Sequence, residues 1–92
     1  MTVRGVIGRL EWGYFTAAAI HGYMVTRTAD VWYLRASVVS TDAYKLAQRP
    51  LIFVAPTKGG EWRWTVRHYT LAAGTLTAEM EPLPDALPIR PT

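Results

Sequence analysis

The amino-acid sequence predicts a mostly β domain, with about six short antiparallel strands forming a small barrel or curved sheet and one short helix near residues 42–48. Two observations predict this fold class. Segments of alternating polar and apolar residues recur along the chain, as is typical of half-buried strands. The linkers between these segments are too short for a parallel crossover, so neighbouring strands should be antiparallel. Residues 1–81 are long enough for one domain and too short for two.

The predicted centre of the sheet runs from Gln48 to Arg67. Leu51 to Ala55 is an unbroken apolar run between two prolines, so both faces of this strand should be covered. A turn with two glycines follows at residues 56–60. Strict alternation begins at Glu61 and separates core residues from solvent-facing ones. The residues predicted to point inward are Trp62, Trp64 and Val66.

Two strands are predicted before this hairpin. Residues 2–12 fit a strand interrupted by glycines, with Val6, Leu10 and Trp12 on its core-facing side. Residues 13–22 contain three consecutive alanines, which suit either a short helix ending at Gly22 or a strand that another layer approaches closely. We favour a strand, because the flanking strands leave little room for a helix and two loops.

A second hairpin is predicted from residues 23–27 and 31–40, around a turn at residues 28–30. Its second strand has an apolar face made of Trp32, Leu34, Ala36 and Val38. Ser40, Thr41 and Asp42 are all residues that cap helix N-termini. We therefore predict a short helix over residues 43–48 that ends before Pro50.

The last predicted strand is Thr75 to Glu81, in which Leu76, Ala78 and Met80 point inward. Its charged outer side is typical of an edge strand, and an edge can accept a strand from another protein. Residues 82–92 contain four prolines, and we expect an extended, disordered tail.

Composition excludes several classes of site. The chain has no cysteine, which excludes disulfides and thiolate metal sites. His21 and His68 are too few ligands for a zinc site, so we expect no metal and no cofactor. Ser40 and Asp42 are better explained as caps than as catalytic groups. We expect no enzymatic activity, because so short a chain has little room for a water-excluding cleft.

Charge and hydropathy bear on location and partners. No signal or transmembrane pattern is visible, so we expect a soluble protein of the cytoplasm, of a host cell or of a virion. The net charge is +3, and residues 1–70 carry nine Lys and Arg against four Asp and Glu. A mildly basic body is compatible with polyanions without requiring them.

The candidate partner-binding residues are Tyr33, Arg35, Arg63, Arg67 and Tyr69. If the two strands that carry them lie close together, these side chains share the outer face of the sheet, and Arg27 and Lys58 would extend it. Guanidinium groups suit carboxylates and phosphates, and tyrosine rings fill a partner's pocket or stack on bases. The alternative is that these side chains only solvate that face.

The segment from Asp42 to Trp64, DAYKLAQRPLIFVAPTKGGEWRW, resembles small uncharacterised proteins of tailed phages and prophages. The resemblance covers about a quarter of the chain and implies a mobile-element context, where small proteins serve as virion components or inhibitors of host proteins. It assigns no functional residue. The sequence thus favours a non-enzymatic interaction module that binds a protein partner or itself through the Arg/Tyr face or the edge strand; a nucleic-acid-binding small β-barrel is the alternative.

Overall fold

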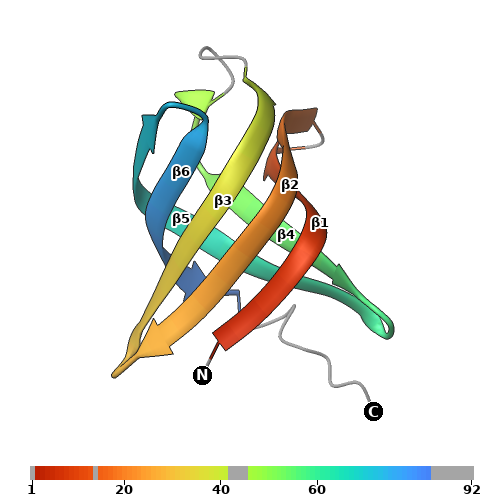
Figure 1. Ribbon diagram of the computed structural model, residues 1–92, viewed down its shortest axis with the longest axis vertical. Coiled ribbons are helices and arrows are strands. Elements are labelled where there is room, and N and C mark those ends of the chain that lie inside the picture. The colour runs from red at the N-terminus through yellow and green to blue at the C-terminus, as the bar shows by residue number, and fades with distance from the viewer. Residues whose placement is uncertain (1, 14, 42–45, 84–92) are drawn as a thin grey trace.

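The computed structural model describes residues 2–13, 15–41 and 46–83 (Figure 1). Six antiparallel strands close into a barrel in the order β1-β2-β3-β6-β5-β4. The strands are β1 (Thr2–Trp12), β2 (Phe15–Thr28), β3 (Val31–Thr41), β4 (Leu51–Thr57), β5 (Gly60–Ala72) and β6 (Thr75–Pro82). The predicted mostly β fold is confirmed, and of the two predicted architectures the chain forms the barrel.

The predicted short helix is not borne out. β3 continues through Thr41, so two of the three expected cap residues belong to a strand. Of the described residues of the segment, Leu46 alone has α-helical conformation, and residues 47–50 form a turn and a bend; residues 42–45 lie outside the described residues. A helix of so few residues is marginal, and capping residues alone do not form one. Leu46 nevertheless lies in the core, as predicted, with 3 % of its surface exposed, and its carbonyl accepts a hydrogen bond from the Tyr69 hydroxyl.

Residues 13–22 were predicted as a strand, and the described residues from Phe15 onward are confirmed as part of β2. Gly22 lies within this strand at a φ of +100°, and the pairing of β2 with β3 shifts register around it. The shift changes which side chains face the core. Ile20 points inward before the glycine and Tyr23 points inward after it, although they are three residues apart.

The alternation of inward and outward side chains also shifts in β1, where β1 pairs with this part of β2. One prediction is therefore wrong. Val6 was expected in the core, but it is 61 % exposed, and Ile7 beside it is 60 % exposed. Gly5 pairs with inward-facing Tyr23, and Gly8 pairs with inward-facing Ile20. The two residues between these glycines therefore lie where the strand changes face, and neither is covered.

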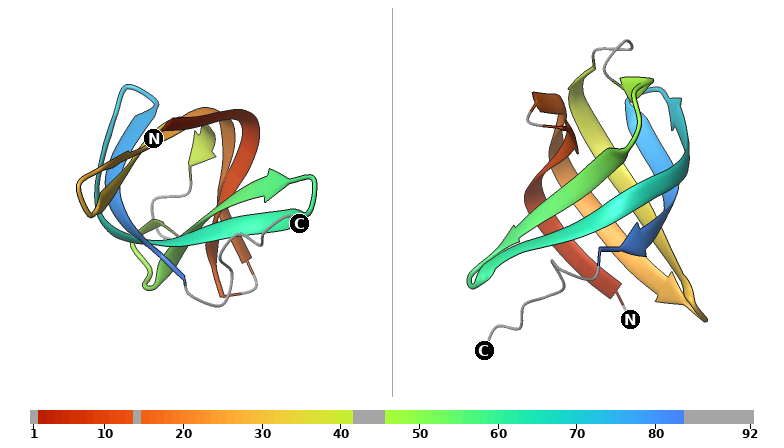
Figure 2. Two further views of the ribbon diagram at one scale, coloured as in Figure 1. Left: turned by 90° about the horizontal axis from the view of Figure 1, so that it is seen from below. Right: turned by 180° about the vertical axis from the view of Figure 1, so that it is seen from behind.

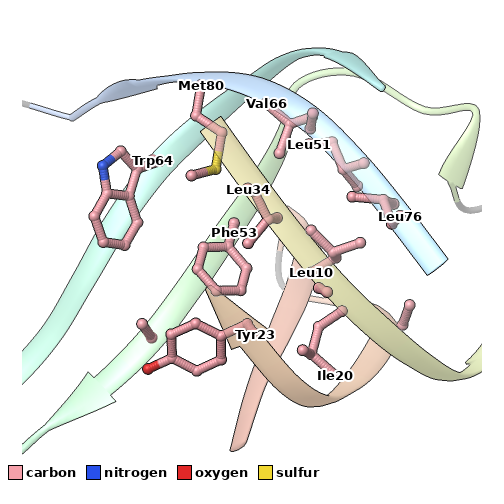
Figure 3. Packing of buried hydrophobic residues seen from close by; sticks show 14 of the residues in the cluster. Leu10, Ile20, Tyr23, Leu34, Leu51, Phe53, Trp64, Val66, Leu76 and Met80 are labelled. Atoms are coloured by element: carbon pink, nitrogen blue, oxygen red, sulfur yellow. The ribbon is translucent and has the colours of Figure 1, made fainter. Parts of the chain in front are cut away.

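The core fills the barrel interior (Figure 3). Trp64 and Val66 are buried and Trp62 packs against the core, as the alternation predicted. The Trp64 ring contacts three other aromatic rings, those of Trp32, Phe53 and Trp62, at centroid distances of 5.7–5.8 Å. The predicted register of this strand is therefore confirmed as far as Val66.

β6 is not the edge strand that its charged side suggested. It pairs with β3 on one side and with β5 on the other, so Thr75–Glu81 offers no free edge. Closure of the barrel satisfies both sides of this strand. Beyond Pro82, the Leu83 N–H donates a hydrogen bond to the Arg63 carbonyl at 3.1 Å. The rest of the predicted tail, residues 84–92, lies outside the described residues.

The barrel is closed by its shortest ladder, between β1 and β4. Only Arg9, Leu10 and Glu11 of β1 pair with β4, whereas every residue of β1 except Val6 pairs with β2. Below this short ladder, the N-terminal half of β1 and the β4–β5 hairpin diverge (Figures 1 and 2). Among the described strands, the residues from Thr2 to Ile7 therefore have partners on β2 alone.

Candidate functional site

The structure does not bring the five candidate residues onto one face. β6 lies between β3 and β5, so the two strands that carry these residues are not neighbours. Tyr33 and Arg35 are exposed on β3. Arg67 is exposed on β5 and pairs with Glu81 at 2.8 Å, in a contact whose two side chains are more than half exposed. Such an exposed pair contributes little to stability.

Tyr69 points toward the core instead of the outer face. Its register partner on β6 is buried Ala78, and its hydroxyl donates to the Leu46 carbonyl at 3.1 Å. The cause is a register shift between Val66 and His68, which reverses the alternation that holds earlier in β5. The Arg49 guanidinium covers the Tyr69 ring at 5.4 Å. Tyr69 therefore packs against the core at one end of the barrel and does not lie on the outer face with the other four residues.

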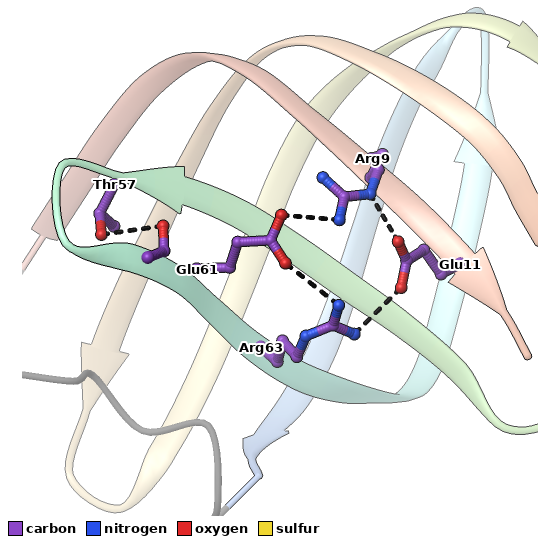
Figure 4. A network of polar contacts seen from close by, with 6 residues as sticks. Arg9, Glu11, Thr57, Glu61 and Arg63 are labelled. Carbon is purple, nitrogen blue, oxygen red and sulfur yellow. Dashed lines mark hydrogen bonds and ion pairs between the residues drawn. The ribbon is translucent and has the colours of Figure 1, made fainter. Parts of the chain in front are cut away.

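Arg63 belongs to a closed ring of four charged side chains that spans β1 and β5 (Figure 4). Glu11 accepts from Arg9 Nε at 2.5 Å and from Arg63 Nη1 at 3.0 Å. Glu61 accepts from Arg9 Nη2 at 2.7 Å and from Arg63 Nη2 at 3.1 Å. We call these four residues the ionic ring. Its charges sum to zero, and its side chains are 18–35 % exposed.

The ionic ring covers the outer face of β4. Arg9 and Arg63 are the two register partners of Val54, one on each side of it. Val54 points to the same outer face as these arginines, yet none of its surface is exposed. The carboxylates bridge the two arginines, so that the methylene stems and charged groups of the ionic ring cover the Val54 side chain. The prediction that β4 is covered on both faces is thereby confirmed.

The electrostatics follow from these contacts. The hydrogen bond from Arg9 is the main cause that lowers the pKa of the Glu61 carboxyl below its ordinary value of 4.5. Burial disfavours the charge on Arg9, but hydrogen bonds to Glu11 and Glu61 outweigh it and raise the pKa of the guanidinium. Elsewhere, burial raises the pKa of the Tyr23 phenol, which lies in the core.

A pH dependence of stability follows for Glu61. Because folding lowers its pKa, its contribution is present in full above the ordinary value of 4.5 and is lost as the pH falls through the lower, folded-state value. We therefore expect the free energy of unfolding to decrease below about pH 4.5, and to decrease less steeply in a Glu61→Gln variant. Urea unfolding at a series of acidic pH values measures both slopes. Equal slopes would show that Glu61 is not held by the ring.

The ionic ring and the Arg67 pair leave few free cations on the barrel. Within residues 2–13, 15–41 and 46–83, Arg4, Arg35, Arg49 and Lys58 have no carboxylate partner. Arg4 and Arg35 are the two register partners of Met24, one on each side of it, whereas Arg49 and Lys58 lie before and after β4. The guanidinium of Arg27 lies 5.6 Å from the centre of the Trp32 ring, and it is 3.9 Å from Asp30.

The free edge of β1 was missed from the sequence. It comprises the backbone of Thr2–Ile7, which faces no other described strand on the side away from β2, and we call it the β1 edge. Gly8, which follows, is buried against Phe53 and Val54 of β4. Val6 and Ile7 lie within it and are among the most exposed large apolar side chains of the described residues. The paired glycines at positions 5 and 8 were a signal for irregularity. They did not reveal which strand would lack a partner.

Metal and membrane sites find no support in the described residues. His21 and His68 are both exposed and lie on different strands. No group of three His, Asp or Glu side chains in the described part of the chain could hold a metal ion. Likewise, no described helix has the length and apolar character to cross a membrane.

Comparison with known proteins assigns no function to this chain. The resemblance of residues 42–64 to phage proteins gains no support from it and stays a hypothesis. No family model, no curated protein and no solved structure matches this chain.

Proposed function

We propose that this domain is a non-enzymatic interaction module that binds a protein partner by adding a strand to the β1 edge. The carrying observation is that no residue of Thr2–Ile7 has a register partner on any described strand but β2, where all of them except Val6 are paired. Unpaired backbone N–H and C=O groups along such an edge form a template for an incoming strand. This edge takes the place of Thr75–Glu81, which β3 and β5 enclose.

The side chains of the β1 edge support this proposal. Natural edges that must stay free are usually protected by lysines, prolines or inward-pointing charges. β1 contains no proline, and its only charge between Thr2 and Gly8 is Arg4. Val6 and Ile7 leave about three fifths of their surface in water, and an added strand would cover part of it.

Nucleic-acid binding has less support. Recognition of a phosphate backbone depends on several cations that are free to contact it. Arg9 and Arg63 are held by carboxylates in the ionic ring, and Arg67 is held by Glu81. Tyr33 and Arg35 remain exposed on β3 and form a smaller second surface for a protein partner. The phage hypothesis, if correct, would make that partner a virion or host protein.

The test compares the two surfaces directly. A photo-crosslinking amino acid at position 7 is used to capture a partner from the extract of the source cells. Binding of that partner is then measured for Ile7→Lys, which alters the β1 edge, and for Arg35→Glu, which alters β3. We expect Ile7→Lys to weaken binding and Arg35→Glu to leave it unchanged. The reverse result would assign binding to the β3 surface and reject the β1 edge.

A further inference from the structure

We infer that the strand added to the β1 edge belongs to a partner protein and carries an acidic side chain opposite Arg4 and an apolar side chain opposite Val6. This inference rests on the proposed function, because it names the chemistry of the strand that the same edge would bind. It goes further by giving a sequence pattern that the partner should contain, in which one residue separates the acidic from the apolar position.

Arg4 and Val6 project from the same face of β1. Val3 packs against the core, and a Cβ atom at Gly5 would meet the buried Tyr23 ring, so these two positions face inward. Side chains alternate along a strand, and Arg4 and Val6 accordingly point outward, where both are exposed. A strand paired with this stretch would alternate in the same way. Its residues opposite Arg4 and Val6 would therefore stand two positions apart on one face.

Arg4 is a free cation on this edge. No ion pair among the described residues includes it, whereas the other two charges of β1, Arg9 and Glu11, belong to the ionic ring. On the β2 side Arg4 is paired with Met24, which carries no charge. The position on its other side is the one that an added strand would fill. Opposite charges stabilise a cross-strand pair and like charges destabilise it, so this position favours an acidic side chain.

Val6 and Ile7 provide the apolar part of the edge. Their side chains are 61 % and 60 % exposed, because β1 changes face between them and both point outward. Val6 has no register partner on β2, and Ile7 is paired there with exposed His21. An apolar side chain opposite Val6 would remove part of this surface from water. A polar side chain at that position would leave the same surface exposed.

A hydrogen-bonding group without a partner lies at the same edge. The Tyr23 hydroxyl oxygen lies 2.2 Å from the position that a Cβ atom of Gly5 would occupy, and it points away from the other labelled core side chains (Figure 3). Although Tyr23 is only 9 % exposed, its hydroxyl makes no hydrogen bond with a described residue. The residue between the acidic and apolar positions of an added strand would lie opposite Gly5, on the side of this hydroxyl.

The test is to select a displayed library of short random peptides on the immobilised full chain. We expect the enriched peptides to share an Asp or Glu two positions from an apolar residue. The dissociation constant of a synthetic peptide with the enriched sequence is then measured by fluorescence anisotropy. Arg4→Glu should raise this constant by about tenfold, because it replaces a pair of opposite charges with a pair of like charges. Exchanging the acidic residue of the peptide for lysine should restore binding to the Arg4→Glu chain.

Arg35→Glu is the matched control. Arg35 and Arg4 are the two register partners of Met24, both are exposed, and neither has a carboxylate partner among the described residues. Arg35, however, is paired with β2 on one side and with β6 on the other, so it does not lie on an edge. Its substitution makes the same change in net charge two strands away. At physiological salt it should change the dissociation constant by less than about twofold.

The failures of this inference and of the proposed function are distinguishable. The inference is overturned if no peptide is enriched, if the enriched peptides lack the acidic residue, or if Arg4→Glu and Arg35→Glu weaken binding equally. The proposed function survives each of these results if Ile7→Lys still weakens binding of the captured partner. Sedimentation equilibrium of the chain alone covers the remaining occupant. A dimer that Ile7→Lys dissociates would place a second copy of the chain at the β1 edge and would also overturn the inference.

Discussion

Glu11→Lys is expected to lower the free energy of unfolding by on the order of 2 kcal/mol. The Glu11 carboxylate accepts hydrogen bonds from both arginines of the ionic ring, and its side chain is only 18 % exposed. A lysine would place a third cation beside Arg9 and Arg63, with only Glu61 left to neutralise them. It would also open the cover over Val54, which otherwise has no exposed surface.

Glu81→Lys is the matched control, because it makes the same change in the Arg67 pair. That pair is 54 % and 59 % exposed and belongs to no ring, so its loss should cost less than about 1 kcal/mol. Urea unfolding of the three proteins at neutral pH gives the two differences. Equal losses for the two variants would show that the ionic ring acts as ordinary surface pairs. In that case Val54 would be covered by packing alone.

The ionic ring also shows where prediction from the sequence ends. The alternation around Glu61 and Arg63 placed both residues correctly on the outer face of β5. Nothing local, however, links Arg63 with Glu11, because the two residues lie 52 positions apart and meet only through the closure of β1 on β4. The sequence therefore predicted that the outer face of β4 is covered, but it did not indicate which side chains cover it.

Bulges account for most of the other differences. Apolar alternation identified the strands and the inward position of Trp64, because period-two patterns report which side chains a sheet buries. The alternation fails at Val6, where β1 changes face beside Gly22 of β2, and again after Val66. Each shift turns the following residues over, which is why Tyr69 was assigned to the surface. A bulge depends on the partner strand, so local sequence gives only a weak signal of it.

The candidate site changed for the same reason. The prediction of an Arg/Tyr face required that β3 and β5 are neighbours and that side chains alternate regularly along β5. In the structure β6 separates the two strands, and the alternation in β5 reverses after Val66. Two exposed residues of that face, Tyr33 and Arg35, remain together on β3. The β1 edge became visible only through the strand order, since a free edge is defined by the strand that is absent beside it.

Gly5→Ala is the second large effect that we expect. A Cβ atom at this position would lie 2.2 Å from the Tyr23 hydroxyl oxygen and 2.3 Å from the ring carbon that bears it. The Tyr23 ring cannot easily yield, because it is buried and packs edge-on against Phe53 at a centroid distance of 5.2 Å. Overpacking of this kind costs about 1–3 kcal/mol. The free energy of unfolding should fall by that amount.

A double-mutant cycle separates this clash from any general cost of changing the strand. In a Tyr23→Ala background the obstructing ring is gone, so Gly5→Ala should cost nothing or slightly stabilise the strand, since glycine is unfavourable in strand interiors. A coupling energy of at least about 1 kcal/mol between the two positions would confirm that Tyr23 lies over Gly5. The same cost in both backgrounds would contradict that packing. It would also remove the structural reason for a glycine at this position of β1.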